Sequence, residues 1–301
     1  MIVHRNVDDT GIREAVVTTG SFDGVHAGHR IILKRIADFA KERGGQSVLI
    51  TFYPHPRKVL YPDTAGRELH MINTQEEKIL LLEQTGIDHL LIIPFSLEFS
   101  KISSVDFIRR ILVEKLAVSH VVVGFNHFFG HNREGDFELL RQLGRFYHFT
   151  VDEIPEKDIQ NESVSSSKIR KALTEGNIQR ANAYLEHPYF MMGSVGDYVQ
   201  GDKIPNLLKL VMPDDDKLIP PPGAYAVAIL HQGLRKKGIA FITADRGERS
   251  VLFTALDENP VVGFPCQIEF YKALQLGGLF EAGTGSSSPE SFAEQVGELI
   301  Y

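Results

Sequence analysis

Short apolar runs alternate with helical patterns over the first half of the chain. Four of these runs are rich in β-branched residues and are bounded by glycine, proline or charged residues, which is typical of strands buried on both faces of a parallel sheet. They cover residues 15–19, 47–53, 89–95 and 120–125. Because helical patterns lie between them, the sequence predicts a doubly wound, Rossmann-like α/β domain with right-handed crossovers.

Three segments between the runs carry apolar residues at helical spacing, residues 30–45, 74–86 and 104–116. The first ends at a glycine pair, which is typical of a helix C-terminus. The second begins at Thr74 with Glu77 three residues later, which is the pattern of a capping box. The first helix is predicted to bury Ile32, Ile36 and Phe39, and the third Phe107, Ile111 and Leu112.

The pattern changes near residue 188. From there the apolar runs are short, alternate with polar residues and are separated by Gly, Pro, Asp or Asn, which is typical of antiparallel strands. We therefore expect an α/β domain over residues 1–187 and a small antiparallel β-barrel domain over residues 188–301. A final helix is predicted from Ser288, with Pro289 in its first turn, after a flexible Gly/Ser-rich connector at 282–288.

Composition limits the kinds of partner that the chain can have. With 301 residues and 43% hydrophobic content, it can bury a sizeable core. Its 32 basic and 39 acidic residues give a formal net charge of -7, so a phosphate site must be locally basic, and nucleic acid is not an expected partner. No signal core or long apolar span is evident, and the single Cys266, read as structural, cannot form an internal disulfide. We expect a cytoplasmic protein without a membrane partner. The sequence does not predict the oligomeric state.

Residues 18–30, TTGSFDGVHAGHR, place three glycines and two histidines between a predicted strand and a predicted helix. Glycine allows a phosphate to approach the backbone closely, and a helix N-terminus offers free N–H groups and a positive dipole end. His26 and His29 are three residues apart, so both can face bound phosphates. Such a site suits nucleotidyl transfer, in which an acceptor attacks an α-phosphate. Catalysis of this reaction depends chiefly on positioning the substrates and stabilising the negative charge that develops on the phosphate oxygens. The alternative is an ordinary tight turn with surface histidines.

Two further segments follow predicted strands and therefore lie at the same edge of the sheet. Residues 121–136, VVVGFNHFFGHNREGD, combine Asn126, which can hydrogen-bond a planar ring, with the flat apolar side chains of Phe125, Phe128 and Phe129. The alternative assigns these phenylalanines to the core. Residues 51–60, TFYPHPRKVL, fix a turn with two prolines, and there His55 or Arg57 suits a second phosphate.

The segment SVSSSKIRKAL, residues 163–173, opens a predicted helix with three consecutive serines. Hydroxyls, N–H groups and the helix dipole converge there with Lys168, Arg170 and Lys171, which suits a pyrophosphate. The alternative is a serine N-cap with a solvated basic face.

Together the four motifs resemble one family, the bacterial bifunctional riboflavin kinase/FAD synthetases. They occur in the family's order and at roughly its separations over about residues 10–187, and EEKILLLEQTGIDHLLIIPF between them is similar to the family as well. The resemblance implies that this part of the chain transfers the adenylyl group of ATP to FMN. FAD and pyrophosphate would be the products, with Mg²⁺ bridging the phosphates of ATP.

By position, the resemblance implies that His26 and His29 hold the ATP phosphates and that Asn126 lies beside the reacting phosphates. These three are the predicted catalytic residues. Further ATP contacts are expected from Gly20, Phe22, Gly24, Gly28, Ser166, Ser167, Lys168 and Arg170, where Ser167 replaces the family's Thr and keeps the hydroxyl. Flavin contacts are expected from His55, Pro56, Arg57, Phe125 and Phe128. No residue is assigned to a metal.

The predicted barrel departs from this family. There it phosphorylates riboflavin with the Thr and Asn of a Pro-Thr-Ala-Asn segment and a catalytic Glu, but this chain has no Pro-Thr-Ala-Asn, and the Glu aligns near Val251 or Leu252. The candidate replacements for the lost groups are residues 213–216, PDDD, for the metal site and Glu269 for the base. PDDD is typical of a solvated loop, and Glu269 alternates with apolar neighbours as an outward residue does. We expect a barrel that keeps the kinase fold without its chemistry.

Two other functions stay open. One is adenylyl transfer to a different acceptor, such as nicotinate mononucleotide or a pantetheine phosphate, although the long aromatic loop argues against it. The other is a catalytically silent protein that binds FMN, FAD or ATP. The phosphate-facing polar groups of the first domain are intact, which argues for catalysis.

Overall fold

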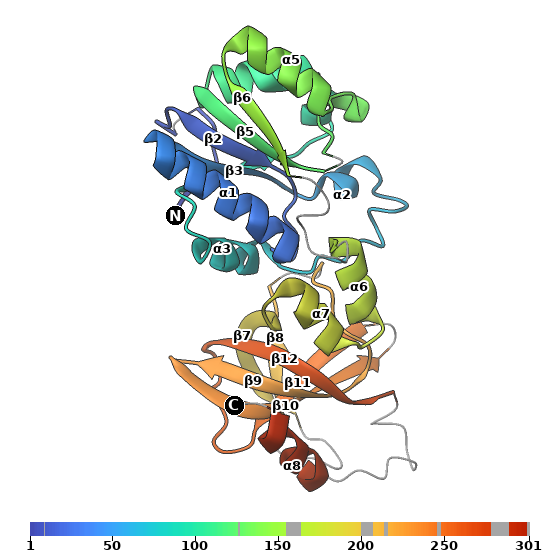
Figure 1. The fold of residues 1–301 in the computed structure, drawn as a ribbon. Helices are drawn as coiled ribbons and strands as arrows, with labels where there is room; N and C mark the ends of the chain where they lie inside the picture. The colour runs from blue at the N-terminus through green and yellow to red at the C-terminus, as the bar shows by residue number, and fades with distance from the viewer. Residues whose placement is uncertain are drawn as a thin grey trace. The chain divides into compact units, whose positions relative to one another are not determined.

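The computed structural model describes residues 1–8, 10–125, 127–154, 164–199, 207–213, 216–245, 248–277 and 289–299. Contacts divide the chain into two compact units (Figure 1). The first consists of Met1–His70 and Lys78–Val164, and the second of Met71–Glu77 and Ser165–Tyr301. The chain therefore enters the second unit briefly at Met71–Glu77 before it returns to the first.

The first unit contains a six-stranded parallel sheet with the order β1-β4-β3-β2-β5-β6. Its strands are β1 (Ile2–His4), β2 (Ala15–Thr19), β3 (Gln46–Tyr53), β4 (His89–Pro94), β5 (Val118–Gly124) and β6 (Thr150–Ile154). The four predicted strands and the α/β class are confirmed. Strands β1 and β6 were not predicted, because both lie at sheet edges, where partly exposed residues replace a continuous apolar run.

Helices pack against the sheet of the first unit. Helix α1 (Ala27–Arg43) contacts β2, β3 and β5, and it ends at Gly44 with a φ of 68°, a left-handed conformation that suits glycine. A core cluster joins alternate residues of the sheet to α4 (Ser104–Phe107), η2 (Ile108–Val113) and α5 (Phe137–Tyr147). The predicted helix over 104–116 is thus a short α-helix that continues as a π-helical segment. Ile32, Ile36, Phe107, Ile111 and Leu112 are buried as predicted, and Phe39 is half-buried.

Helix α3 (Gln75–Glu83) begins with the predicted capping box. The backbone N–H of Glu77 donates to the Thr74 hydroxyl at 3.2 Å, and the backbone N–H of Thr74 donates to the Glu77 carboxylate at 2.9 Å. Each side chain thus satisfies one N–H of the first turn, which no helical carbonyl reaches.

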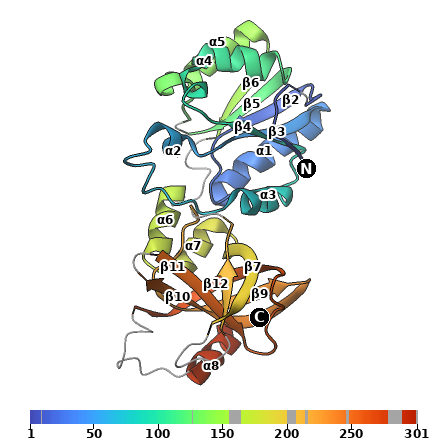
Figure 2. The same cartoon turned by 180° about the vertical axis from the view of Figure 1, so that it is seen from behind.

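The second unit is built on a closed antiparallel barrel with the strand order β10-β11-β8-β7-β12-β9. Figure 2 shows this unit from behind. The predicted barrel is confirmed. Its strands are β7 (Tyr189–Val199), β8 (Leu207–Val211), β9 (Gly223–His231), β10 (Leu234–Asp245), β11 (Glu248–Ala255) and β12 (Pro265–Leu276). Helix α8 (Pro289–Leu299) has Pro289 in its first turn, as predicted, and packs Phe292 and Val296 against alanines of β9. The predicted connector at 282–288 lies outside the described residues.

Helices α6 (Ser166–Thr174) and α7 (Ile178–Leu185) belong to the second unit. Asn182 of α7 donates through Nδ2 to the Phe270 carbonyl at 2.8 Å, and its Oδ1 accepts from the Tyr189 N–H at 2.7 Å. The predicted boundary between residues 187 and 188 follows the change of sequence pattern. Grouping by contacts instead places both helices with the barrel.

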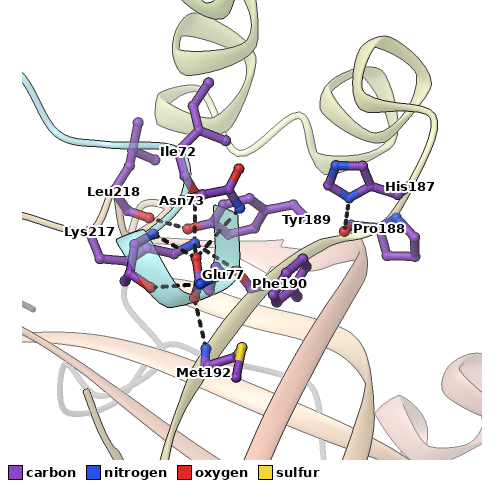
Figure 3. A network of polar contacts seen from close by, with 11 residues as sticks. Ile72, Asn73, Glu77, His187, Pro188, Tyr189, Phe190, Met192, Lys217 and Leu218 are labelled. Carbon is purple, nitrogen blue, oxygen red and sulfur yellow. Dashed lines mark hydrogen bonds and ion pairs between the residues drawn. The ribbon is translucent and has the colours of Figure 1, made fainter. Parts of the chain in front are cut away.

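A buried ion pair holds Met71–Glu77 within the second unit (Figure 3). The side chains of Lys217 and Glu77 are fully buried and in direct contact. Lys217 Nζ also donates to the carbonyls of Ile72 at 2.6 Å and Phe190 at 2.8 Å. The second carboxylate oxygen of Glu77 accepts from the Met192 N–H at 2.8 Å. Both charges therefore have several polar partners, which offset the cost of removing them from water.

Loss of Lys217 would leave Glu77 buried and unpaired. We expect Lys217→Met to lower the free energy of unfolding by about 3–5 kcal/mol, the usual cost of removing one partner of a buried pair. Urea unfolding followed by circular dichroism measures this. The control is Glu258→Ala, because Glu258 pairs with Lys236 at 3.4 Å but its side chain is 89% exposed; its expected change is about 0–1 kcal/mol. An unchanged unfolding midpoint in Lys217→Met would contradict the stabilising role.

Candidate functional site

Three loops meet at the carboxyl edge of the parallel sheet in the first unit. Strand β2 lies between β3 and β5, so the segments that follow Thr19, Tyr53 and Gly124 leave the sheet side by side. The chain adds β3 and β4 on one side of β2 and places β5 and β6 on the other. Strand order therefore reverses between β2 and β5, which is where open α/β sheets bind ligands.

The turn between β2 and α1 has an unusual backbone. Gly24 has a φ of 90°, and Phe22 and Val25 have φ values of 48° and 41°, a region that side chains with a Cβ rarely adopt. Such conformations cost about 1–3 kcal/mol each and cluster at functional sites. A Cβ added at Gly20 would approach the Phe22 ring to 3.1 Å. Glycine is therefore favoured at Gly24 by its φ and at Gly20 by the closeness of the Phe22 ring, and Gly28 is buried in the first turn of α1.

The structure brings His26 and His29 together. His26 is the N-cap of α1, and its Nδ1 accepts from the His29 N–H at 3.4 Å. The two rings stack with centroids 3.6 Å apart, and the Phe22 ring lies 4.5 Å from that of His29. His26 is only 6% exposed and His29 is half-buried, so neither is the surface histidine of the alternative interpretation. Among the residues that the structure describes, none forms a hydrogen bond with the buried Nδ1 of His29.

A lysine that the sequence analysis did not single out lies beside this turn. Lys78 of α3 belongs to the first unit and is 6% exposed. Its Nζ donates to the Ser21 carbonyl at 3.3 Å and to the Thr51 hydroxyl at 3.2 Å. Burial lowers its pKa to about 8, and the carboxylate of Asp23 acts in the opposite direction. Burial also lowers the pKa of His29 well below its usual value, and the charges of His26 and Lys78 lower it further.

Asp23 is also a residue that the sequence analysis missed, although it lies inside the quoted motif. It is 1% exposed, and its charge favours the charged form of Lys78. The sequence signal for Asp23 was its position in the glycine-rich turn, three residues before His26. Lys78 lies far along the chain from the motif. Its signal was the segment EEKILLLEQTGIDHLLIIPF, which resembled the family without suggesting a role for any one residue.

The loop after β5 presents two exposed phenylalanines. Phe125 is 48% and Phe128 44% exposed, so the alternative that places them in the core is wrong, whereas Phe129 packs against the core cluster. The guanidinium of Arg133 lies 4.7 Å from the Phe128 ring centroid. The loop closes through two backbone hydrogen bonds between Phe129 and Gly135, at 3.0 and 2.9 Å. Asn126, a predicted catalytic residue, lies outside the described residues.

The segment after β3 forms the short helix α2 (Pro56–Leu60). His55 is its N-cap, and His55 Nδ1 accepts from the Arg57 N–H at 3.2 Å. Pro56 opens the helix and Arg57 is exposed. The fold thus places all three predicted residues at the carboxyl edge of the sheet, next to the histidine turn.

The serine-rich motif opens α6, in the second unit. Ser165 is the N-cap and accepts from the Lys168 N–H at 3.4 Å, which agrees with the interpretation as a serine cap. Ser166 and Ser167 are the first helical residues, and Ser167 and Lys168 are exposed. The ATP contacts expected from Ser166, Ser167, Lys168 and Arg170 stay a prediction.

Within the described residues, no three His, Cys, Asp or Glu side chains are grouped so that they could hold a metal ion. Cys266 is buried, and burial raises the pKa of its thiol to about 12, which agrees with a structural cysteine. None of the helices in the described ranges is long and apolar enough to span a membrane.

The sequence model of the FAD synthetase family matches residues 9–168, which is more than half of the chain. The chain belongs to the FAD synthetase family. The match contains the histidine turn, the segment after β3, the aromatic loop and the first residues of α6, and it ends before the barrel. The resemblance of the four motifs to this family is thereby confirmed.

Curated relatives of this FAD synthetase family member include bifunctional riboflavin kinase/FMN adenylyltransferases from three bacteria. The protein from Listeria monocytogenes is 31% identical over 269 residues, covering 85% of this chain and 83% of the relative. That from Escherichia coli K12 is 32% identical over 221 residues, covering 72% and 69%. That from Bacillus subtilis 168 is 30% identical over 280 residues, covering 87% and 84%.

The fold also matches a crystal structure described as a macrolide-efflux protein from Streptococcus pneumoniae. The TM-score is 0.81 at 22% sequence identity, over 99% of this chain and 96% of that one. At this identity the match concerns the fold alone.

Proposed function

We propose that this member of the FAD synthetase family transfers the adenylyl group of ATP to FMN, and that its barrel does not phosphorylate riboflavin. ATP enters as its Mg²⁺ complex. The observation that supports adenylyl transfer most strongly is the stacked pair of His26 and His29 at the N-terminus of α1, where the strand order of the sheet reverses.

In the proposed reaction, a phosphate oxygen of FMN attacks the α-phosphorus of ATP. The bond from that phosphorus to the oxygen bridging to the β-phosphorus breaks, and pyrophosphate leaves. Negative charge grows on the bridging oxygen, so groups that donate hydrogen bonds there lower the barrier. Because the pKa of His29 is low, its ring is neutral near pH 7 and donates through the one nitrogen that carries a proton. The positive end of α1 acts on the same phosphates.

The flavin is proposed to lie at the loops after β3 and β5, with His55, Pro56, Arg57, Phe125 and Phe128 as contacts. The exposure of the two phenylalanines supports this, because a planar ring can stack only on an accessible face. We also propose that Asn126 acts beside the reacting phosphates and that Ser166, Ser167, Lys168 and Arg170 hold phosphates of ATP. We further propose that the functional boundary of the chain lies between residues 187 and 188, so that α6 serves adenylyl transfer although its contacts group it with the barrel.

The proposed partners are the small-molecule substrates ATP and FMN, without nucleic acid or a membrane. The net charge of -7 supports small-molecule substrates rather than nucleic acid. The cytoplasmic location stays a prediction.

Three observations on the barrel support the proposed loss of kinase activity. Val251 and Phe253 of β11 are fully buried and Leu252 is 8% exposed, so the position expected for the kinase's catalytic Glu is apolar and enclosed. Glu269, the candidate replacement, accepts from the Tyr271 hydroxyl at 2.9 Å and pairs with Arg235 at 3.2 Å. Of the three aspartates in the PDDD segment only Asp216 is described, and its backbone carbonyl accepts from the Met71 N–H at 2.7 Å.

Replacement of His29 by alanine tests the role of the histidine pair. We expect His29→Ala to form FAD from FMN and MgATP at least about 10²-fold more slowly, because one hydrogen-bond donor to the developing charge is lost. Chromatographic separation of the flavins measures the rate. His148→Asn is the control, since His148 is exposed at the C-terminus of α5 in a left-handed conformation that Asn tolerates. A fully active His29→Ala protein would overturn the assigned role.

Replacement of Phe128 by alanine tests the flavin contact. We expect the KM for FMN to rise roughly tenfold while the KM for ATP stays unchanged, because loss of one stacking face costs about 1–3 kcal/mol. Initial rates at varied FMN and varied ATP give both constants. Phe146→Ala, on α5 and 70% exposed, should change neither. Equal effects on both substrates would argue against flavin stacking at Phe128.

Riboflavin as substrate tests the loss of kinase activity. With MgATP and riboflavin we expect no FMN, because absence of a general base alone lowers a rate by about 10²–10⁴. Chromatography detects the product, and the bifunctional relative from Bacillus subtilis is the positive control. FMN formed at a rate comparable to that relative would show that the barrel retains another catalytic group.

A further inference from the structure

Three hydrogen bonds join Lys78, Thr51 and Ser21 in the first unit. Its ammonium donates to the Ser21 carbonyl and the Thr51 hydroxyl, and the Thr51 hydroxyl donates to the same carbonyl at 3.2 Å. Ser21 directly precedes Phe22, whose φ of 48° marks the strained part of the turn. Lys78 and Thr51 therefore fix the carbonyl from which the bend towards the histidines starts.

A buried ammonium that bonds to neutral oxygens is costly. Charged groups with less than a tenth of their surface exposed are usually paired, because desolvation otherwise favours the neutral form. Lys217 shows the usual arrangement, since its Nζ lies against the Glu77 carboxylate. At Lys78 the carboxylate of Asp23 favours the charged form, yet burial has the larger effect. A cation kept at such cost beside a phosphate site points to a function beyond packing.

Resting on the proposed adenylyl transfer, we propose that Lys78 is a positioning residue of that reaction. Its two hydrogen bonds hold the Ser21–Gly24 turn in the shape that seats His26 and His29, and its positive charge favours binding of the ATP phosphates there. A phosphate-binding site in a chain of net charge -7 requires such a local cation.

Four titratable side chains lie close together around the turn. Asp23, His26, His29 and Lys78 are the titratable groups that face one another there, from the turn, α1 and α3. Burial lowers the pKa of His29 most, the charge of His26 lowers it further, and the smallest of the three contributions is the positive charge of Lys78. Removal of that charge therefore raises the pKa of His29, and the acid limb of kcat/KM for ATP should move to higher pH.

The dependence of kcat/KM on pH at alkaline values gives a second test of the role of Lys78. Lys78 has a pKa of about 8, so it loses its proton as pH rises through that value, and kcat/KM for ATP should fall there. An arginine at this position stays charged over the same range. We expect Lys78→Arg to lack the alkaline limb near pH 8.

The experiment compares Lys78→Met, Lys78→Arg and Thr51→Val with the wild type. We expect Lys78→Met to lose about 10²-fold in kcat/KM for ATP, Lys78→Arg to recover at least tenfold of that loss, and Thr51→Val to lose less than Lys78→Met. Lys34→Met is the control, because Lys34 lies on the exposed face of α1 and its side chain is 75% exposed. Circular dichroism melting of each variant shows whether it is folded.

Two outcomes would overturn the inference. One is wild-type kcat/KM in Lys78→Met. The other is an equal loss in Lys78→Met and Lys78→Arg with neither limb of the pH profile moved, which is the result expected of a purely structural lysine. If the wild type forms no FAD, the proposed function fails instead. Calorimetric titration of MgATP then tests Lys78 by itself, since its charge should still strengthen ATP binding, and equal affinity in Lys78→Met would overturn its role.

Discussion

The parallel pairing of β2 with β3 on one side and β5 on the other is the constraint on which the candidate site depends. Parallel strands end at one edge, so the three segments that follow them must meet there, however far apart they lie in the sequence. The strands are buried on both faces, which leaves the strand ends as the place where polar groups can face a ligand. The histidine turn, the segment after β3 and the aromatic loop all occupy that edge.

Much of this arrangement could be predicted from local sequence. Apolar, β-branched runs predict the inner strands, and a capping box predicts the start of α3, because hydrogen bonds and burial within a few residues decide both. The edge strands β1 and β6 lacked that signal. Lys78 was missed for another reason: its bonds to Ser21 and Thr51 join residues from three separate elements, and no local pattern encodes such a contact. The placement of Met71–Glu77 in the second unit was also not predictable from local sequence, because it depends on the ion pair of Glu77 with Lys217, which lies far along the chain.

The buried lysines Lys217 and Lys78 differ in the groups that surround their positive charge. Lys217 lies against Glu77 and is surrounded by carbonyl oxygens, so its charge is neutralised and its contribution is to stability. Lys78 bonds to neutral oxygens near Asp23 and two histidines, and we propose that its charge acts on the phosphates of a substrate. On this account the barrel unit of a bifunctional family has kept its fold, while the chemistry is confined to the carboxyl edge of the parallel sheet.

The central claim, adenylyl transfer without phosphoryl transfer, is tested most directly by the fate of labelled phosphates. The protein is incubated with Mg²⁺, riboflavin, FMN and ATP labelled either at the α- or at the γ-phosphorus, and the flavins are separated. The account predicts that the α-label enters FAD and that the γ-label appears in pyrophosphate and in no flavin. Label from the γ-position in FMN, or none from the α-position in FAD, would contradict it.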